Sequence, residues 1–125
     1  LARALQQYDF VLCNVKAPDL CGHDRDPQRK AQVIEQIDGL VAQLLENYRE
    51  PFYLIFTGDH STPCSVGDHS GDPVPVLLHG PDLRGDEVLR FHEYACARGA
   101  LGRLRGGDLM PIITQLMGVQ EKFGA

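Results

Sequence analysis

An aspartate and two histidines in the middle of the chain have the residue types and spacing of metal ligands. Asp59 and His60 are adjacent, and His69 follows nine residues after His60. Apolar runs at 52–56 and 74–78 flank this polar stretch and are typical of short buried strands. In an open α/β sheet, ligands bind at the carboxyl ends of the strands. Carboxylate and imidazole groups at such a place predict a site for Zn²⁺, Mn²⁺ or a similar cation.

A second set of candidate ligands lies nearer the beginning of the chain. Asp19 and His23 follow another apolar run, at 8–15. One histidine alone is more often structural than a ligand, but this combination beside strand ends favours a metal site. Adjacent side chains of an extended segment point to opposite faces, so Asp59 and His60 predict two cations, one on each side. Two cations about 4 Å apart are the usual arrangement for phosphoryl transfer.

Five further residues have weaker claims to a role in the site. Lys16, Arg103 and Arg105 are candidate contacts for an anionic substrate, and solvated surface charge is the alternative. Cys21 and Cys64 lie within the predicted ligand loops. Burial as small side chains is favoured for both cysteines over sulfur ligation.

The apolar pattern predicts the elements that position these residues. Strands are expected at 8–15, 52–56 and 74–78, and a helix with one buried stripe at 27–48. Asp26 followed by Pro27 marks the start of this helix, because aspartate caps and proline suits the first helical position. Strand, helix and strand in this order predict parallel pairing with a right-handed crossover.

The ends of the chain give less definite predictions. We expect the last turns of a helix at 1–7, a short helix at 91–98, an edge strand or loop at 100–105, and a frayed tail at 119–125. A final helix is predicted to begin with Asp108 as its cap and to end at Gly118. The chain opens at Leu1 inside a helical pattern, which predicts that it is the tail of a longer polypeptide.

The length and the composition of the chain favour some kinds of protein and exclude others. The 125 residues suffice for one domain with a modest core, and 43% hydrophobic residues favour a folded chain. The net charge of −5 argues against binding nucleic acid through its phosphates. No apolar run approaches the roughly 20 residues of a membrane span. The four cysteines are widely spaced and form no C-x-x-C pair, which favours a reducing, cytoplasmic setting.

Three stretches together resemble the archaeal-type cofactor-independent phosphoglycerate mutases of the alkaline phosphatase superfamily. They are KAPDLCGHDRD, TGDHSTPCSVGDHSGDPVPVLLHG and ARGALGRLRGGDLMPIITQLMG. The order Asp-x-x-x-His, Asp-His, His is that of the superfamily's two-metal site. The resemblance implies an α/β fold: residues 1–125 would be the C-terminal portion of a doubly wound, mostly parallel sheet with flanking helices. The N-terminal part and an inserted substrate domain of such enzymes would be absent.

The resemblance also implies a reaction and a ligand set. The reaction is the interconversion of 3-phosphoglycerate and 2-phosphoglycerate in glycolysis, through a phosphoserine intermediate and without 2,3-bisphosphoglycerate. Two divalent cations would be bound, Mn²⁺ or Zn²⁺, with Mg²⁺ and Co²⁺ as alternatives. Asp19, His23 and His69 are the implied ligands of one cation, and Asp59 and His60 those of the other.

The nucleophilic serine of this family lies in the N-terminal part of the enzyme. We therefore expect no catalytic nucleophile within these residues, no activity of the chain by itself, and the N-terminal segment as its partner. Two other functions stay open. One is a two-metal phosphatase or other phosphoester hydrolase on the same scaffold, and the other is a stand-alone metal-binding module. The sequence predicts neither the oligomeric state nor which metal is bound.

Overall fold

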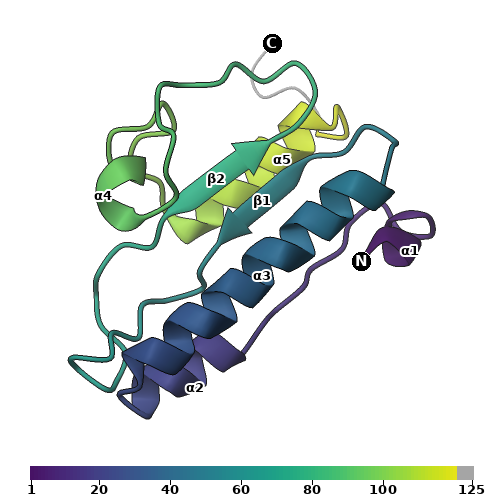
Figure 1. Ribbon diagram of the computed structural model, residues 1–125. Helices are drawn as coiled ribbons and strands as arrows, with labels where there is room; N and C mark the ends of the chain where they lie inside the picture. Colours follow the sequence, from purple (N-terminus) through teal and green to yellow (C-terminus); the bar gives the residue numbers. More distant parts are fainter. Residues whose placement is uncertain (121–125) are drawn as a thin grey trace. The chain divides into compact units, whose positions relative to one another are not determined.

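The computed structural model describes residues 1–120, and these form an α/β structure, as predicted. The elements in chain order are α1 (Ala2–Leu5), α2 (Ala17–His23), α3 (Pro27–Asn47), β1 (Leu54–Thr57), β2 (Val76–His79), α4 (Glu93–Cys96), the 3₁₀ turn η1 (Gly106–Asp108) and α5 (Leu109–Leu116) (Figure 1). The chain divides into two compact units. Unit 1 comprises Leu1–Pro51 and Gly58–Val74, and unit 2 comprises Phe52–Thr57 and the chain from Pro75 onward.

Unit 1 is built on the packed helices α2 and α3. The predicted start of α3 is confirmed: the carboxylate of Asp26 accepts the backbone N–H of Arg29 at 2.9 Å, and Pro27 occupies the first helical position. Arg25 between the helices has a positive φ of 56°. This left-handed residue ends α2 and lets the chain reverse into α3.

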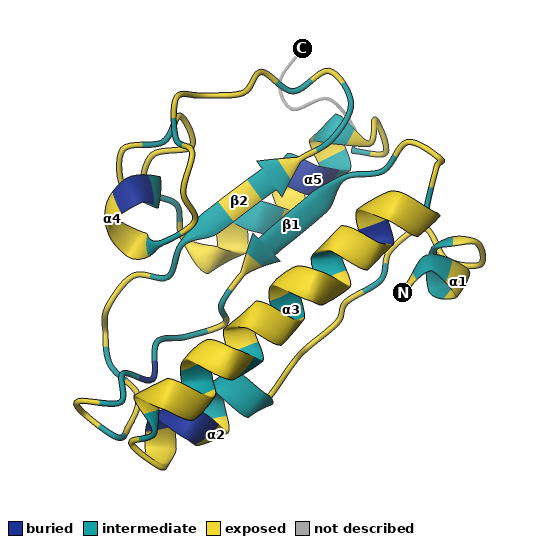
Figure 2. Cartoon of the chain, viewed as in Figure 1, coloured by how far each residue is buried: buried dark blue, intermediate teal, exposed yellow. Residues whose placement is uncertain are grey.

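The apolar stripe of α3 is covered only in part (Figure 2). Leu44 is its one buried member, and Val33, Ile37 and Val41 are half-buried. The other three predicted members are exposed; they are Ile34, Leu40 and Leu45. The helix is therefore as predicted, but the single fully buried face is not, because the described residues supply too few apolar partners to cover it.

The predicted strand at 8–15 is wrong for this structure. The segment runs between α1 and α2 as irregular chain, and Leu12 is 82% exposed. A strand needs a neighbouring strand to pair with its backbone N–H and C=O groups. Within residues 1–120 no strand pairs with this segment, so the expected parallel βαβ pairing does not form.

Unit 2 contains a two-stranded antiparallel sheet. β1 and β2 pair from Leu54 opposite His79 to Thr57 opposite Val76. Both strands begin two residues later than predicted, and Pro75 explains the start of β2, because proline has no N–H for the ladder. Helix α5 lies beside the sheet (Figure 1), where the hydroxyl of Tyr53 donates to the carbonyl of Leu116 at 3.1 Å.

The rest of unit 2 is mostly loop. α4 is shorter than the predicted helix, and 100–105 is turn and loop rather than strand. Gly118 follows α5 with a φ of 69°, the left-handed conformation expected after a helix end. The Asp108 carboxylate accepts the N–H of Arg105 instead of capping α5. The frayed tail predicted at 119–125 lies mostly outside the described residues.

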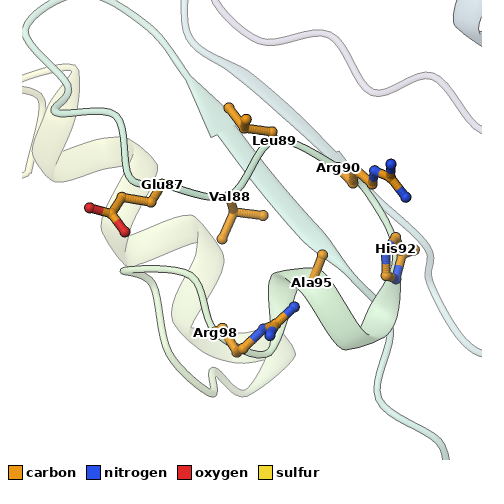
Figure 3. Close-up of a pocket in the computed structure, with 7 residues that line it drawn as sticks. All are labelled: Glu87, Val88, Leu89, Arg90, His92, Ala95 and Arg98. Atoms are coloured by element: carbon orange, nitrogen blue, oxygen red, sulfur yellow. The ribbon is translucent and has the colours of Figure 1, made fainter.

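A pocket of about 560 Å³ in unit 2 is lined by the loop before α4, by α4 and by the turn after it, with Arg90, His92 and Arg98 among its side chains (Figure 3). None of the predicted metal ligands lines it. Within residues 1–120, none of the helices combines the length and the apolar character needed to cross a bilayer.

Candidate metal centre

Helix α2 positions the first two predicted ligands. Asp19 lies in its first turn and His23 in its last, four residues apart and therefore on one face. The Nε2 atom of His23 is 3.5 Å from Oδ1 of Asp19. The sequence predicted a loop here. The structure forms a helix instead, because Pro18 lies in the first helical turn, where the missing N–H has no intrahelical partner to lose.

The loop after β1 brings two further histidines to the same place. Its two arms are joined where the N–H of Ser70 donates to the carbonyl of Ser61 at 2.9 Å. This pairing sets the rings of His60 and His69 side by side, with centroids 3.9 Å apart. The Nε2 atom of His69 is 3.5 Å from Oδ1 of Asp19, and Nδ1 of His60 is 3.9 Å from it.

Three imidazoles thus surround one carboxylate oxygen, all within unit 1. Asp19, His60 and His69 each offer a ligand atom within 4.8 Å of the others. His23 adjoins this group, since its ring centroid lies 5.2 Å from that of His69. The structure therefore brings together the residues predicted for one cation, and it adds His60, which was assigned to the other.

Asp59 lies beside this group in a way that the sequence did not predict. Asp59 and His60 form a bend rather than an extended segment, and Oδ2 of Asp59 is 3.6 Å from Nε2 of His60. The expectation that the two side chains point to opposite faces is wrong. That geometric reason for two cations is lost, and the assignment to two sites then depends on the family resemblance.

The ligand loop is held by hydrogen bonds from helix α2 and the turn that follows it. The guanidinium of Arg25 donates to the carbonyls of Ser65 and Val66 at 3.1 and 2.7 Å. Gly67 has a φ of 72°, and a Cβ there would meet Nε of Arg25 at 2.6 Å, so glycine suits both requirements. Nδ1 of His23 is 3.2 Å from the carbonyl of Gly67. A carbonyl only accepts, so Nδ1 donates this hydrogen bond, and Nε2 is the ring nitrogen that faces Asp19.

Hydrogen bonds keep the Asp19 carboxyl ionised. Nζ of Lys16 lies 2.6 Å from Oδ2, and the hydroxyl of Thr62 donates to Oδ1 at 2.6 Å. The contact with Lys16 and then that with Thr62 hold the pKa of Asp19 well below its usual range. The same contact with Asp19 raises the pKa of Lys16. Lys16, predicted as a substrate contact, is thus paired with a predicted metal ligand.

The donor set fits a divalent cation of the Zn²⁺ or Mn²⁺ type. It combines an anionic carboxylate with imidazole nitrogens, and the second nitrogen of His23 donates to a backbone carbonyl, as is usual for metal-binding histidines. Cys21 is buried and Cys64 is half-buried, with its thiol directed to the carbonyl of Cys21. These contacts agree with the packing role predicted for both cysteines.

One residue that contacts two of the predicted ligands was not predicted from the sequence. Thr62 is only 4% exposed, and its hydroxyl contacts both Asp19 and His60. A threonine is not predicted to have this role from its residue type. The one indication in the sequence is its position, two residues after His60. Arg103 and Arg105 belong to unit 2, and their role in substrate binding stays a prediction.

Comparisons with known proteins place the chain in a family. The family model described as the Metalloenzyme superfamily matches residues 1–116. The chain is 47% identical over 122 residues to the 2,3-bisphosphoglycerate-independent phosphoglycerate mutase of Thermococcus gammatolerans, covering 97% of this chain and 30% of that protein. It is 45% identical over 126 residues to the 2,3-bisphosphoglycerate-independent phosphoglycerate mutase 1 of Methanocaldococcus jannaschii, covering 100% of this chain and 31% of that protein.

A solved structure of a Pyrococcus horikoshii protein matches with a TM-score of 0.95 and 46% identity, over 99% of this chain and 38% of that one. The chain thus spans about a third of the length of the relatives that it matches, 30% in the first of them. The family match and the cluster of carboxylate and imidazole groups lead to one conclusion: the chain belongs to the Metalloenzyme superfamily.

Proposed function

We propose that this chain is the metal-binding part of a phosphoglycerate mutase that interconverts 3-phosphoglycerate and 2-phosphoglycerate without 2,3-bisphosphoglycerate. The observation that carries the proposal is the convergence of imidazole nitrogens on one ionised carboxylate, that of Asp19. Relatives that are 44–47% identical across nearly the whole chain are named as such mutases, and this supports the choice of substrate.

Two divalent cations are proposed, Mn²⁺ or Zn²⁺, with Mg²⁺ and Co²⁺ as alternatives. Asp19, His23 and His69 would hold one, because both imidazole Nε2 atoms lie 3.5 Å from the same Asp19 oxygen. Asp59 and His60 would hold the other, supported by their 3.6 Å approach. Bound cations of this kind stabilise the charge of a transferring phosphoryl group and help to ionise a nucleophile.

The residues of this chain keep the ligands ionised and oriented. Lys16 and Thr62 hold Asp19 as an anion, and the carbonyl of Gly67 orients the ring of His23. The Lys16 side chain is 62% exposed, so its ammonium group is able to meet a substrate phosphate beside the cluster. Arg103 and Arg105 are proposed as further substrate contacts.

The remaining parts of the catalyst are proposed to lie in a longer polypeptide. It would supply the serine that carries the phosphoryl group, and strands that complete a doubly wound, mostly parallel sheet around residues 1–125. The segment 8–15 would be one strand of that sheet, which agrees with its apolar sequence and its exposed side chains. The protein would act in glycolysis in the cytoplasm.

An activity assay tests this proposal. The longer polypeptide should convert 3-phosphoglycerate to 2-phosphoglycerate with no added 2,3-bisphosphoglycerate, lose activity to a chelator, and regain it with Mn²⁺ or Zn²⁺. The 125-residue chain alone should show no turnover, because the nucleophile is absent. Release of inorganic phosphate without formation of 2-phosphoglycerate would instead indicate a phosphoester hydrolase.

A further inference from the structure

The ring of His60 lies between two carboxylates. Its Nδ1 atom is 3.9 Å from Oδ1 of Asp19, and its Nε2 atom is 3.6 Å from Oδ2 of Asp59. A neutral imidazole carries a proton on one nitrogen and a lone pair on the other. The nitrogen that carries the proton therefore decides with which aspartate His60 shares a cation.

The hydroxyl of Thr62 makes this choice. Its oxygen is 2.6 Å from Oδ1 of Asp19 and 3.2 Å from Nδ1 of His60. An ionised carboxylate only accepts, so the single hydroxyl proton of Thr62 must go to Asp19. The Thr62 oxygen is then left with lone pairs alone, and only a protonated Nδ1 of His60 makes a hydrogen bond to it.

Thr62 is held firmly enough to impose this arrangement. It is 4% exposed, and its backbone carbonyl accepts a hydrogen bond from Nζ of Lys30 at 2.8 Å. Gly22 of helix α2 lies against it so closely that a Cβ on Gly22 would be 2.3 Å from the carbonyl oxygen and 2.8 Å from Cγ2 of Thr62. Because both its backbone and its side chain are enclosed, the hydroxyl cannot readily turn away from the two ligands.

We propose that Thr62 is a positioning residue that fixes His60 with the proton on Nδ1, so that Nε2 provides the lone pair for a divalent cation shared with Asp59. The proton assignment depends only on the contacts among Asp19, Thr62 and His60. The cation is that of the proposed function, so this second half rests on it. In this arrangement His60 belongs with Asp59, and His23 and His69 share Asp19.

The first experiment needs no metal. Long-range nitrogen–proton NMR spectra of the metal-free protein, recorded at a pH at which the His60 signals are those of a neutral ring, report the state of each ring nitrogen. For His60 we expect a protonated Nδ1 and an unprotonated Nε2. A protonated Nε2 would overturn the proposal whatever the protein binds. The His60→Ala variant assigns the signals by their loss.

The second experiment measures Zn²⁺ affinity by calorimetry in the wild-type protein and two variants. Thr62→Val keeps the size of the buried side chain but removes the hydroxyl, and we expect the affinity of the site at Asp59 to fall by about 10- to 100-fold. Thr62→Ser keeps the hydroxyl and should bind within about threefold of wild type. Thr114→Val is the matched control, since the Thr114 hydroxyl contacts carbonyls within α5.

The outcomes separate the two proposals. Unchanged Zn²⁺ affinity in folded Thr62→Val would overturn the positioning role. If this variant does not fold, either a loss of Zn²⁺ affinity in folded Thr62→Ser or an unprotonated Nδ1 of His60 in the wild-type protein would overturn it. If the wild-type protein binds no Zn²⁺ or Mn²⁺, the proposed function and the metal half of this inference both fail. The proton on His60 is still decided by NMR.

Discussion

The loop 58–70 and the segment 8–15 both belong to unit 1, but they differ in the contacts that hold them in place. The loop 58–70 is polar, yet its path is fixed by hydrogen bonds from Arg25, His23 and its own Ser61–Ser70 pair. The segment 8–15 is apolar and has the composition of a strand, yet its side chains are largely exposed and it pairs with no strand among residues 1–120. Whether a segment is held in place depends on the hydrogen-bonding partners within reach, and an apolar composition alone does not supply them.

The difference has a physical cause. The hydrogen bonds that hold the loop, whether from the side chains of Arg25 and His23 or between the backbones of Ser61 and Ser70, lie within unit 1, so the described chain contains both partners of each. A strand instead needs a whole row of backbone groups from a neighbouring strand. The loop therefore has its partners in this structure, whereas the proposal that segment 8–15 is a strand of a larger sheet requires such a neighbour.

The largest expected effect is that of a substitution in the loop 58–70. In the longer polypeptide, His69→Ala should lower the proposed mutase activity by more than about 100-fold and weaken one of the proposed cation sites, because removing a ligand should matter at least as much as removing a group that orients one. Leu44→Ala is the control: it removes a buried α3 side chain, should cost about 2–5 kcal/mol of unfolding free energy, and should leave metal binding intact. Equal loss of metal in both variants would mean that unfolding explains the first.

The next effect tests segment 8–15 itself. In the 125-residue chain, Leu12→Ala should change the unfolding free energy by less than about 0.5 kcal/mol, because the side chain is exposed. In the longer polypeptide the same substitution should cost about 2–5 kcal/mol if a neighbouring strand covers it. Denaturant unfolding of both proteins gives the two values. Similar small values in both would show that the segment stays uncovered.

A matched pair of glycines sharpens the comparison at the helix that carries Asp19. Alanine normally stabilises a helix interior relative to glycine by about 0.5–1 kcal/mol. Gly39→Ala in α3 should show this gain, since no atom lies within 4 Å of the new Cβ. Gly22→Ala in α2 should instead cost about 1–3 kcal/mol, because the new Cβ would overlap Thr62. Thermal unfolding compares them, and a gain at both sites would mean that the loop does not press on α2.

The sequence predicted local structure well where both partners of an interaction are close in the chain. The cap at Asp26, the helix α3 and the glycine after α5 depend on contacts within a few residues, and all three are confirmed. The pairing of strands depends on distant chain, and there the prediction fails: the parallel pairing expected between 8–15 and 52–56 does not form, because 8–15 has no partner strand among the described residues.

The candidate site shows the same limit. Residue types identified the histidines and aspartates, because few other residues bind cations of this kind. They did not predict that α2 is a helix or that Asp59 turns toward His60, since both depend on local backbone geometry. Thr62 was missed because a threonine shows its role only through the atoms that surround it.

The smallest expected effect concerns the loop of unit 2 that contains Asp86. Like the loop 58–70, it is held by hydrogen bonds between a side chain and backbone groups. The Asp86 carboxylate accepts the N–H of Ala100 at 2.7 Å and that of Val88 at 2.9 Å. These bonds, that with Ala100 first, lower the pKa of Asp86.

A pKa that is lower in the folded than in the unfolded chain stabilises the fold above the unfolded value of about 3.9, and this stabilisation is lost as the pH falls through the folded value. Unfolding followed from about pH 6 to pH 2 should therefore show a steeper acid loss of stability in wild type than in Asp86→Asn, whose amide does not titrate. Asp82→Asn, an exposed aspartate in the preceding turn, is the control for removing one negative charge. Because Asp86 is itself exposed, the difference should be modest. Identical acid profiles for wild type and Asp86→Asn would show that these two bonds do not hold the loop in solution.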